Sequence, residues 1–176
     1  MKRILTGLSI LGLLLFTATA SAASANGTTN VQITVAADAT ITVPATCTLT
    51  SAGAFANYSG SCASTYSVRT AKVGGTGQIQ LAASSDWVPN TVGSVGPTLA
   101  GDNLSFTISG NTGPGTENST LTRIAATATN YNVITAMGAN AHGNNAGFSS
   151  NFTLVNSPAW ETDTYHVPVV YTLTAN

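Results

Sequence analysis

The C-terminal stretch Thr164–Ala175 alternates polar and apolar side chains with a period of two residues. Its polar positions include His166, Thr172 and Thr174. The odd positions are apolar or aromatic: Tyr165, Val167, Val169, Tyr171 and Leu173. This period is typical of a β-strand with one buried face, so we predict a C-terminal core strand that a sheet is built around. Pro168 has no backbone N–H to donate, which suits a bulge or the solvent side of a sheet edge.

A second alternating stretch begins at Val31 and ends at Val43. Every odd position in it is apolar: Val31, Ile33, Val35, Ala37, Ala39, Ile41 and Val43. As one strand, these residues would span roughly 43 Å at about 3.3 Å each, whereas strands are commonly about five or six residues long. We therefore expect two strand-length halves that meet near Ala37 and Asp38, the second of which begins the chain's own sheet.

Shorter segments between these ends also carry strand patterns, separated by glycine-rich and proline-rich turns. Leu121–Ala128 fits either a strand or a short helix, and its threonines favour a strand. Met137–Gly147 is rich in glycine and asparagine and is predicted to be a loop. The remaining strands are expected at Ser64–Ala71, around Ile79 and Leu81, at Leu104–Ile108, at Tyr131–Thr135, and around Phe152 and Leu154. Eight to ten short strands without an amphipathic helix predict an all-β fold, and we favour a two-layer β-sandwich over a barrel.

Two cysteines, Cys47 and Cys62, enclose a segment of small residues that also carries Phe55 and Tyr58. We expect a disulfide bond between them, which would contribute roughly 3 kcal/mol by closing a loop of about 15 residues. We expect the two aromatic side chains to fold beneath it against the core. A metal pair or a catalytic thiol is the alternative, but the distant histidines give no metal-ligand spacing.

The first 22 residues have the three parts of a secretory signal peptide. Met1–Arg3 is basic, Ile4–Phe16 is apolar, and Ala20-Ser21-Ala22 fits a cleavage site. The alternative, a membrane anchor, would need an apolar run of about 20 residues. We predict a signal peptide at 1–22, a flexible lead at 23–29 and a single domain at 30–176. The protein is then expected to be secreted, extracellular or at the cell surface, and free of the membrane once the signal is removed.

Charged residues make up only 6% of the chain. Removal of the signal peptide leaves three basic side chains against six acidic ones, a formal net charge of −3. No basic patch is available for phosphate, so we expect no nucleic-acid partner. The hydrophobic share of 43% argues against disorder. The surface must consist mainly of Ser, Thr, Asn and Gly.

The pattern provides no recognisable catalytic centre. His142 lies in the predicted loop and His166 on the polar side of the last strand, so both are expected to face solvent. Glu161 and Asp163 could seed a weak Ca²⁺ site, but few acids and no G-x-S-x-G motif argue against glycosidase and serine-hydrolase chemistry. We expect no enzyme activity, no cofactor and no resident metal.

Trp87 is expected to anchor the long loop Ser84–Gly101 on the edge of the domain. Together with Trp160 and the tyrosines, it could form an aromatic platform for sugars. The alternative is that these rings fill the core and its rim.

Both end stretches resemble a known family. The segment Asn30–Val43 resembles the N-terminal segment of chaperone-usher pilins, particularly the colonisation-factor class. Thr164–Thr174 is similar to the C-terminal strand of those pilins and of spore-coat-U-like secreted domains, where a Tyr precedes alternating Val and Thr. The resemblance implies an immunoglobulin-like β-sandwich that lacks one strand and is completed by the N-terminal extension of the next subunit. It also implies a secretion chaperone as a partner.

We therefore expect a structural subunit that associates with identical copies in an extracellular fibre, pilus-like assembly or surface layer. Val31, Ile33 and Val35 would be the donated residues, since an extended segment can add a strand to a neighbour's sheet edge. The alternative is a monomeric secreted binding module for carbohydrate or a cell surface, using Trp87 and Trp160.

Overall fold

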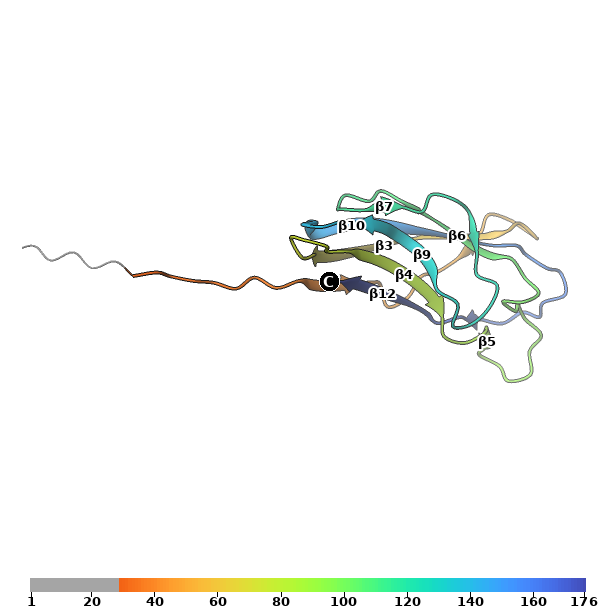
Figure 1. The fold of residues 1–176 in the computed structure, drawn as a ribbon. Helices are drawn as coiled ribbons and strands as arrows, with labels where there is room; N and C mark the ends of the chain where they lie inside the picture. Colours follow the sequence, from red (N-terminus) through yellow and green to blue (C-terminus); the bar gives the residue numbers. More distant parts are fainter. Residues whose placement is uncertain (1–28) are drawn as a thin grey trace, which may run out of the picture. The chain divides into compact units, whose positions relative to one another are not determined.

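The computed structural model describes residues 29–176, so the predicted signal peptide and all but the last residue of the lead lie outside the described residues. Residues 34–176 form one compact unit, and 29–33 belong to a separate one. The described chain contains twelve β-strands and no helix (Figure 1). The all-β prediction is confirmed.

Two antiparallel sheets make up most of the domain. The first has the order β1-β3-β10-β6-β8, with β2 also paired to β3, and the second has the order β12-β4-β9-β7. β11 and β5 pair with each other in a separate two-stranded sheet. The strands are β1 (Asp38–Thr42), β2 (Thr50–Ser51), β3 (Tyr58–Arg69), β4 (Gly77–Ala83), β5 (Val88–Pro89), β6 (Leu104–Ser109), β7 (Thr116–Glu117), β8 (Thr122–Arg123), β9 (Tyr131–Met137), β10 (His142–Leu154), β11 (Tyr165–His166) and β12 (Val169–Ala175).

The core lies between these sheets because their inward positions are apolar. Phe106 on β6 is fully buried in the first sheet, and Ile79 on β4 is fully buried in the second. The outward positions of β3 and β10 carry mainly Ser, Thr, Asn and Gly, as a strand with one solvated face requires. Two antiparallel sheets around a shared core are consistent with a β-sandwich.

The C-terminal stretch differs from the single strand that its pattern predicts. It forms β11 and β12, separated by Val167 and Pro168, and β12 pairs only with β4 at the edge of its sheet. Pro168 cannot donate to a ladder, which explains why the strand breaks there. The centre of the first sheet is instead the long β3–β10 pair.

The predicted loop Met137–Gly147 is wrong in its second half, because β10 begins at His142. The partner strand β3 supplies hydrogen bonds to this glycine- and asparagine-rich stretch. The register shifts between Gly143 and Ala146, and Asn145 has φ 52°. A bulge of this kind accommodates residues that otherwise favour turns.

Two further expectations are corrected. Of Leu121–Ala128, only Thr122–Arg123 forms a strand, although Ile124 is fully buried and donates its N–H to the Leu104 carbonyl over 2.8 Å. Phe55, expected to fold beneath the disulfide, is 75% exposed and has φ 59°. The disulfide between Cys47 and Cys62 is present, with the Cα atoms 5.8 Å apart.

Candidate functional site

An elongated apolar groove of about 1120 Å³ opens between the two sheets. One wall is the segment 43–49, which follows β1, and the opposite wall is Val167–Tyr171, which includes the start of β12. Apolar side chains of the core form its floor: Leu104, Phe152 and Leu154. Trp87 and Trp160 line the end formed by the long loops. Such a concave, largely apolar surface is the default place to look for a binding site.

The first wall is held to its sheet by covalent and packing contacts. β1 ends at Thr42, two residues before Pro44, which has no N–H for a ladder. The chain then leaves β3, and the bond from Cys47 to Cys62 ties it back to that strand. Leu49 packs against the core immediately before β2. This wall therefore has a fixed position.

The second wall has an unpaired backbone edge. At the two ends of the β12–β4 ladder, the Ser84 N–H donates to the Pro168 carbonyl and the Asn176 N–H donates to the Thr76 carbonyl, each over 3.0 Å. Even-numbered residues thus direct their N–H and C=O groups toward β4, because these groups alternate in direction along a strand. The odd-numbered residues of β12, from Val169 to Ala175, direct theirs to the free edge.

The same odd-numbered residues turn their side chains toward the core. Val167, Val169, Tyr171 and Leu173 pack against it and remain partly exposed. Val170, of the opposite parity, is 51% exposed. Of the predicted C-terminal core residues, Tyr165 lies instead in the β11–β5 ribbon, opposite Pro89. The groove therefore has an apolar row and a free backbone edge on the same strand.

β1 covers only one end of this strand. It lies beside β12 but pairs with β3, and among the described strands no ladder joins β1 to β12. Beyond Thr42 the chain departs along the segment 43–49, and the groove is open from there toward the long loops. An additional extended segment would therefore lie beyond the end of β1, between the segment 43–49 and β12.

The loop end of the groove is held together by hydrogen bonds to carboxylates. Glu161 accepts from the Val95 N–H over 2.9 Å, and Asp163 accepts from the Thr91 N–H over 2.8 Å. The Thr91 bond is the main reason that the pKa of Asp163 is lowered from its usual value. The Tyr165 hydroxyl also bonds this loop, at 2.7 Å from the Val95 carbonyl oxygen.

The Glu161 and Asp163 carboxylates thus bind backbone donors. Across residues 29–176, no group of three or more His, Cys, Asp and Glu side chains is arranged to hold a metal. His166 is exposed, with its Nε2 2.9 Å from Asn90 Oδ1, and His142 is exposed with its Nδ1 3.0 Å from the Asn140 carbonyl oxygen.

The two tryptophans both line the groove and are partly exposed. Trp160 stacks on Tyr58, with ring centroids 6.4 Å apart and an interplanar angle of 29°. Trp87 packs against the core, and its indole N–H is buried without a hydrogen-bond partner in the described part of the chain.

The predicted donor residues are exposed and outside any strand. Val31, Ile33 and Val35 are 89%, 80% and 58% exposed, and β1 begins at Asp38, where the two halves of the alternating stretch were expected to meet. The groove itself could not be found from the sequence, because its floor is built from residues distant along the chain. Pro44 and Pro168, which interrupt its two walls, are the only signals that the pattern offers.

No helix in residues 29–176 is long and apolar enough to cross a membrane. The chain matches no protein-family model, no curated protein and no solved structure at a significant level.

Proposed function

We propose that this protein is exported and acts as a structural subunit of an extracellular fibre, pilus-like assembly or surface layer, without catalytic activity. In this assembly, Val31–Val35 of one copy occupies the groove of the next and completes an immunoglobulin-like sandwich. The observation that carries the proposal is the unpaired edge of β12 beside an apolar groove. An exposed edge of this kind is a template for strand addition.

The donated segment and the groove have complementary patterns. Alternate side chains of the segment are apolar and exposed, while alternate backbone groups of β12 are free to pair. Burial of each Val or Ile side chain contributes about 1.5–3 kcal/mol. Three such side chains, together with the new ladder, provide enough favourable free energy to offset the ordering of a short segment.

Site-directed variants of the donor segment test the proposal. Ile33→Asp places a charge among the odd-numbered apolar residues, which would face the groove. Its matched control, Thr34→Asp, places the same charge among the even-numbered residues, which would face away from it. We expect Ile33→Asp to weaken self-association of the processed protein by at least about thirtyfold, because a buried unpaired charge is costly. Thr34→Asp should change it by less than about threefold. If analytical ultracentrifugation shows that the two variants weaken self-association equally, the odd-numbered side chains do not insert into the groove.

Deletion of residues 23–36 should abolish assembly, and a synthetic peptide of residues 29–37 should bind the truncated domain. Electron micrographs of the processed protein and of native cell surfaces provide the second readout. If neither shows filaments or layers under any condition, the structural role is wrong.

The second candidate is a monomeric secreted binding module for carbohydrate or a cell surface. The observation that favours it is that Trp87 and Trp160 both line the groove. A glycan array distinguishes the two functions, because the domain lacking 23–36 should retain binding if sugars are the ligand. No glycan binding by that truncated domain would eliminate the carbohydrate version.

A further inference from the structure

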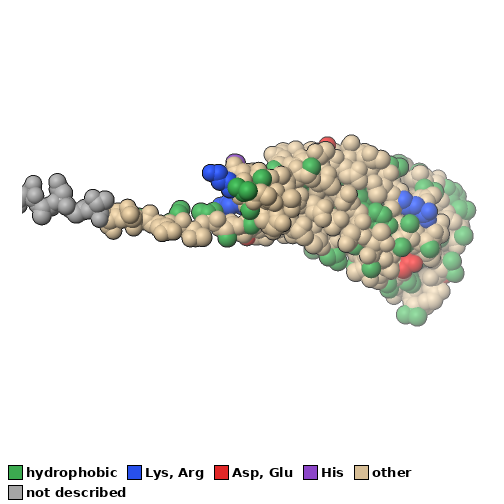
Figure 2. Space-filling model, in the orientation of Figure 1, with side chains coloured by type: hydrophobic (Ala, Val, Ile, Leu, Met, Phe, Trp, Pro, Cys, Tyr) green, Lys and Arg blue, Asp and Glu red, His purple; other side chains and the backbone are tan. Residues whose placement is uncertain are grey.

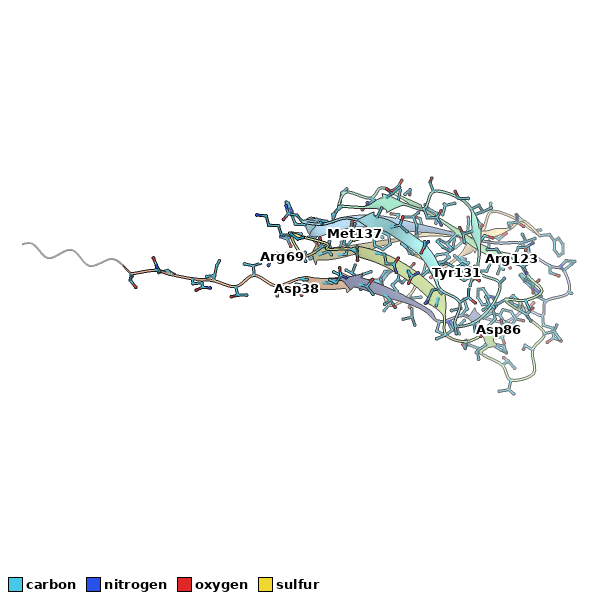
Figure 3. All side chains as sticks on the ribbon, viewed as in Figure 1. Asp38, Arg69, Asp86, Arg123, Tyr131 and Met137 are labelled. Carbon is cyan, nitrogen blue, oxygen red and sulfur yellow. A yellow bond between two sulfur atoms is a disulfide. The ribbon has the colours of Figure 1, made fainter. Side chains whose placement is uncertain are left out.

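Apart from Glu117 on β7, the charged side chains of the domain lie at its two ends. Arg69 is the last residue of β3, and its ladder partners are Asp38 on β1 and His142 on β10. Lys72 follows in the exposed turn after β3. Figure 3 shows Asp38 and Arg69 at one end of the domain. With Asp38 counted, Arg69 and Lys72 give this end a formal net charge of +1, and we call it the basic end.

The opposite end is acidic. Asp86 accepts from the Leu99 N–H over 2.7 Å, and Asp102 accepts from the Thr98 N–H over 2.7 Å, in the same loop that Glu161 and Asp163 hold. Figure 3 shows Asp86 and Arg123 at this end, far from Arg69.

These four carboxylates with Arg123 have a formal net charge of −3, and we call this group the acidic end. The guanidinium of Arg123 is held within its own domain, since it donates a hydrogen bond to the Ala100 carbonyl over 2.7 Å. Most of the surface between the two ends is uncharged on the face shown in Figure 2.

The length of the chain between the donated residues and β1 decides which ends would meet. Three residue steps join Val35 to Asp38, and extended chain covers at most about 3.6 Å per step. A neighbour whose Val35 lies in the groove therefore has the start of its own β1 within roughly 11 Å.

The residues that line the groove indicate the end at which the donated segment exits toward its own domain. β1 covers the other end of β12, so the segment leaves through the open end, where Glu161 and Asp163 line the groove. The donor's Val35 is nearest its own domain and so lies at this opening. The basic end of the donor, beside Asp38, is then placed against the acidic end of the acceptor.

We infer that copies of this chain associate head to tail through an electrostatic interface between the basic end of one copy and the acidic end of the next. This inference rests on the proposed function and adds a contact outside the groove. The partner is a second copy of the chain for two reasons. The short connection from Val35 to Asp38 brings the basic end of the donor close to the acidic end of the acceptor, and these two ends carry opposite net charges. A head-to-tail contact between different surfaces repeats without closing, which builds a filament. Opposite charges at close range also speed association and suppress wrong orientations.

The test compares two double variants with the same change in net charge. Arg69→Gln/Lys72→Gln removes two positive charges from the basic end. Ala63→Glu/Ser109→Glu adds two negative charges on the outer face of the first sheet, where both residues are exposed and pair with Ser149 near the middle of β10. In low salt we expect the basic-end variant to assemble roughly tenfold more slowly than the control. At about 0.5 M NaCl the difference should disappear, because the screening length falls to a few Å.

Binding of the free 29–37 peptide to the domain lacking 23–36 separates this inference from the proposed function. The peptide carries no basic end, so its affinity should be the same for a truncated domain of either double variant. If the peptide binds but both full-chain variants assemble at the same rate in low salt, the electrostatic interface is refuted and strand donation stands. If the peptide does not bind at all, the proposed function fails, and the interface fails with it.

Discussion

The hydrogen bond between Tyr171 and Ser150 connects the groove wall to the first sheet, and its removal has a calculable effect. The Tyr171 hydroxyl donates to Ser150 Oγ over 2.8 Å, and Ser150 is fully buried. Tyr171→Phe keeps the ring, which packs against Phe148 with centroids 6.2 Å apart, and leaves the buried serine oxygen without that donor. We expect a loss of about 1–3 kcal/mol in the free energy of unfolding, since an unsatisfied buried polar group costs that much.

A double-mutant cycle isolates the bond. Ser150→Ala leaves the tyrosine hydroxyl unpaired and should cost a similar amount. The double variant removes both partners, so its cost should fall short of the sum by about 1 kcal/mol or more. Urea unfolding followed by tryptophan fluorescence measures all four proteins, with equal m-values as the check on two-state behaviour. Additive losses within about 0.3 kcal/mol would refute the coupling.

Three further predictions concern the domain alone. Replacing Cys47 and Cys62 by Ser should lower the free energy of unfolding by about 2–5 kcal/mol, and an unchanged urea midpoint would contradict this. Burial raises the pKa of Tyr66 and of Tyr171 above the ordinary value. Because the folded state favours their neutral form, the stability that they contribute is full below about pH 10 and is lost as pH rises further. Thermal melts from pH 8 to pH 12 should show this loss, and a flat profile would reject it. Trypsin should cut the folded domain first after Lys72, in the exposed turn between β3 and β4, and mass spectrometry of the fragments identifies the site.

The strands that could be predicted are those whose side-chain alternation comes from a core-facing side. Tyr66 and Val68 on β3, and Ile79 and Leu81 on β4, are apolar at every second position and are buried. Their pattern is local, so the sequence reveals it. The place of a strand within its sheet cannot be predicted in this way, because an edge strand and a central strand can show the same alternation of side chains. This is why the C-terminal stretch was expected at the centre and lies at an edge.

The missed features depend on partners that are distant in sequence. Asn144 and Asn145 favour turns by themselves, yet they lie within β10 because β3 extends far enough to pair with residues on both sides of the bulge. The groove floor joins Leu104 to Phe152 and Leu154 through the β6–β10 ladder. No periodicity in any single segment encodes that juxtaposition. The alternating apolar pattern of Val31–Val35, by contrast, is contained in five consecutive residues and can be recognised without knowledge of distant partners.

The pairing of β12 with β4 has a consequence for how fast the protein can fold. Val169 is opposite Ala83, so the ladder cannot begin to form until almost the whole chain has been synthesised. Topologies dominated by such distant pairings fold in milliseconds to seconds, far more slowly than helical bundles. During that delay β4 itself is a bare edge, and two incomplete chains could pair through it in the wrong register. Early shielding of this edge of β4, opposite the edge that pairs with β9, would reserve it for the terminal strand.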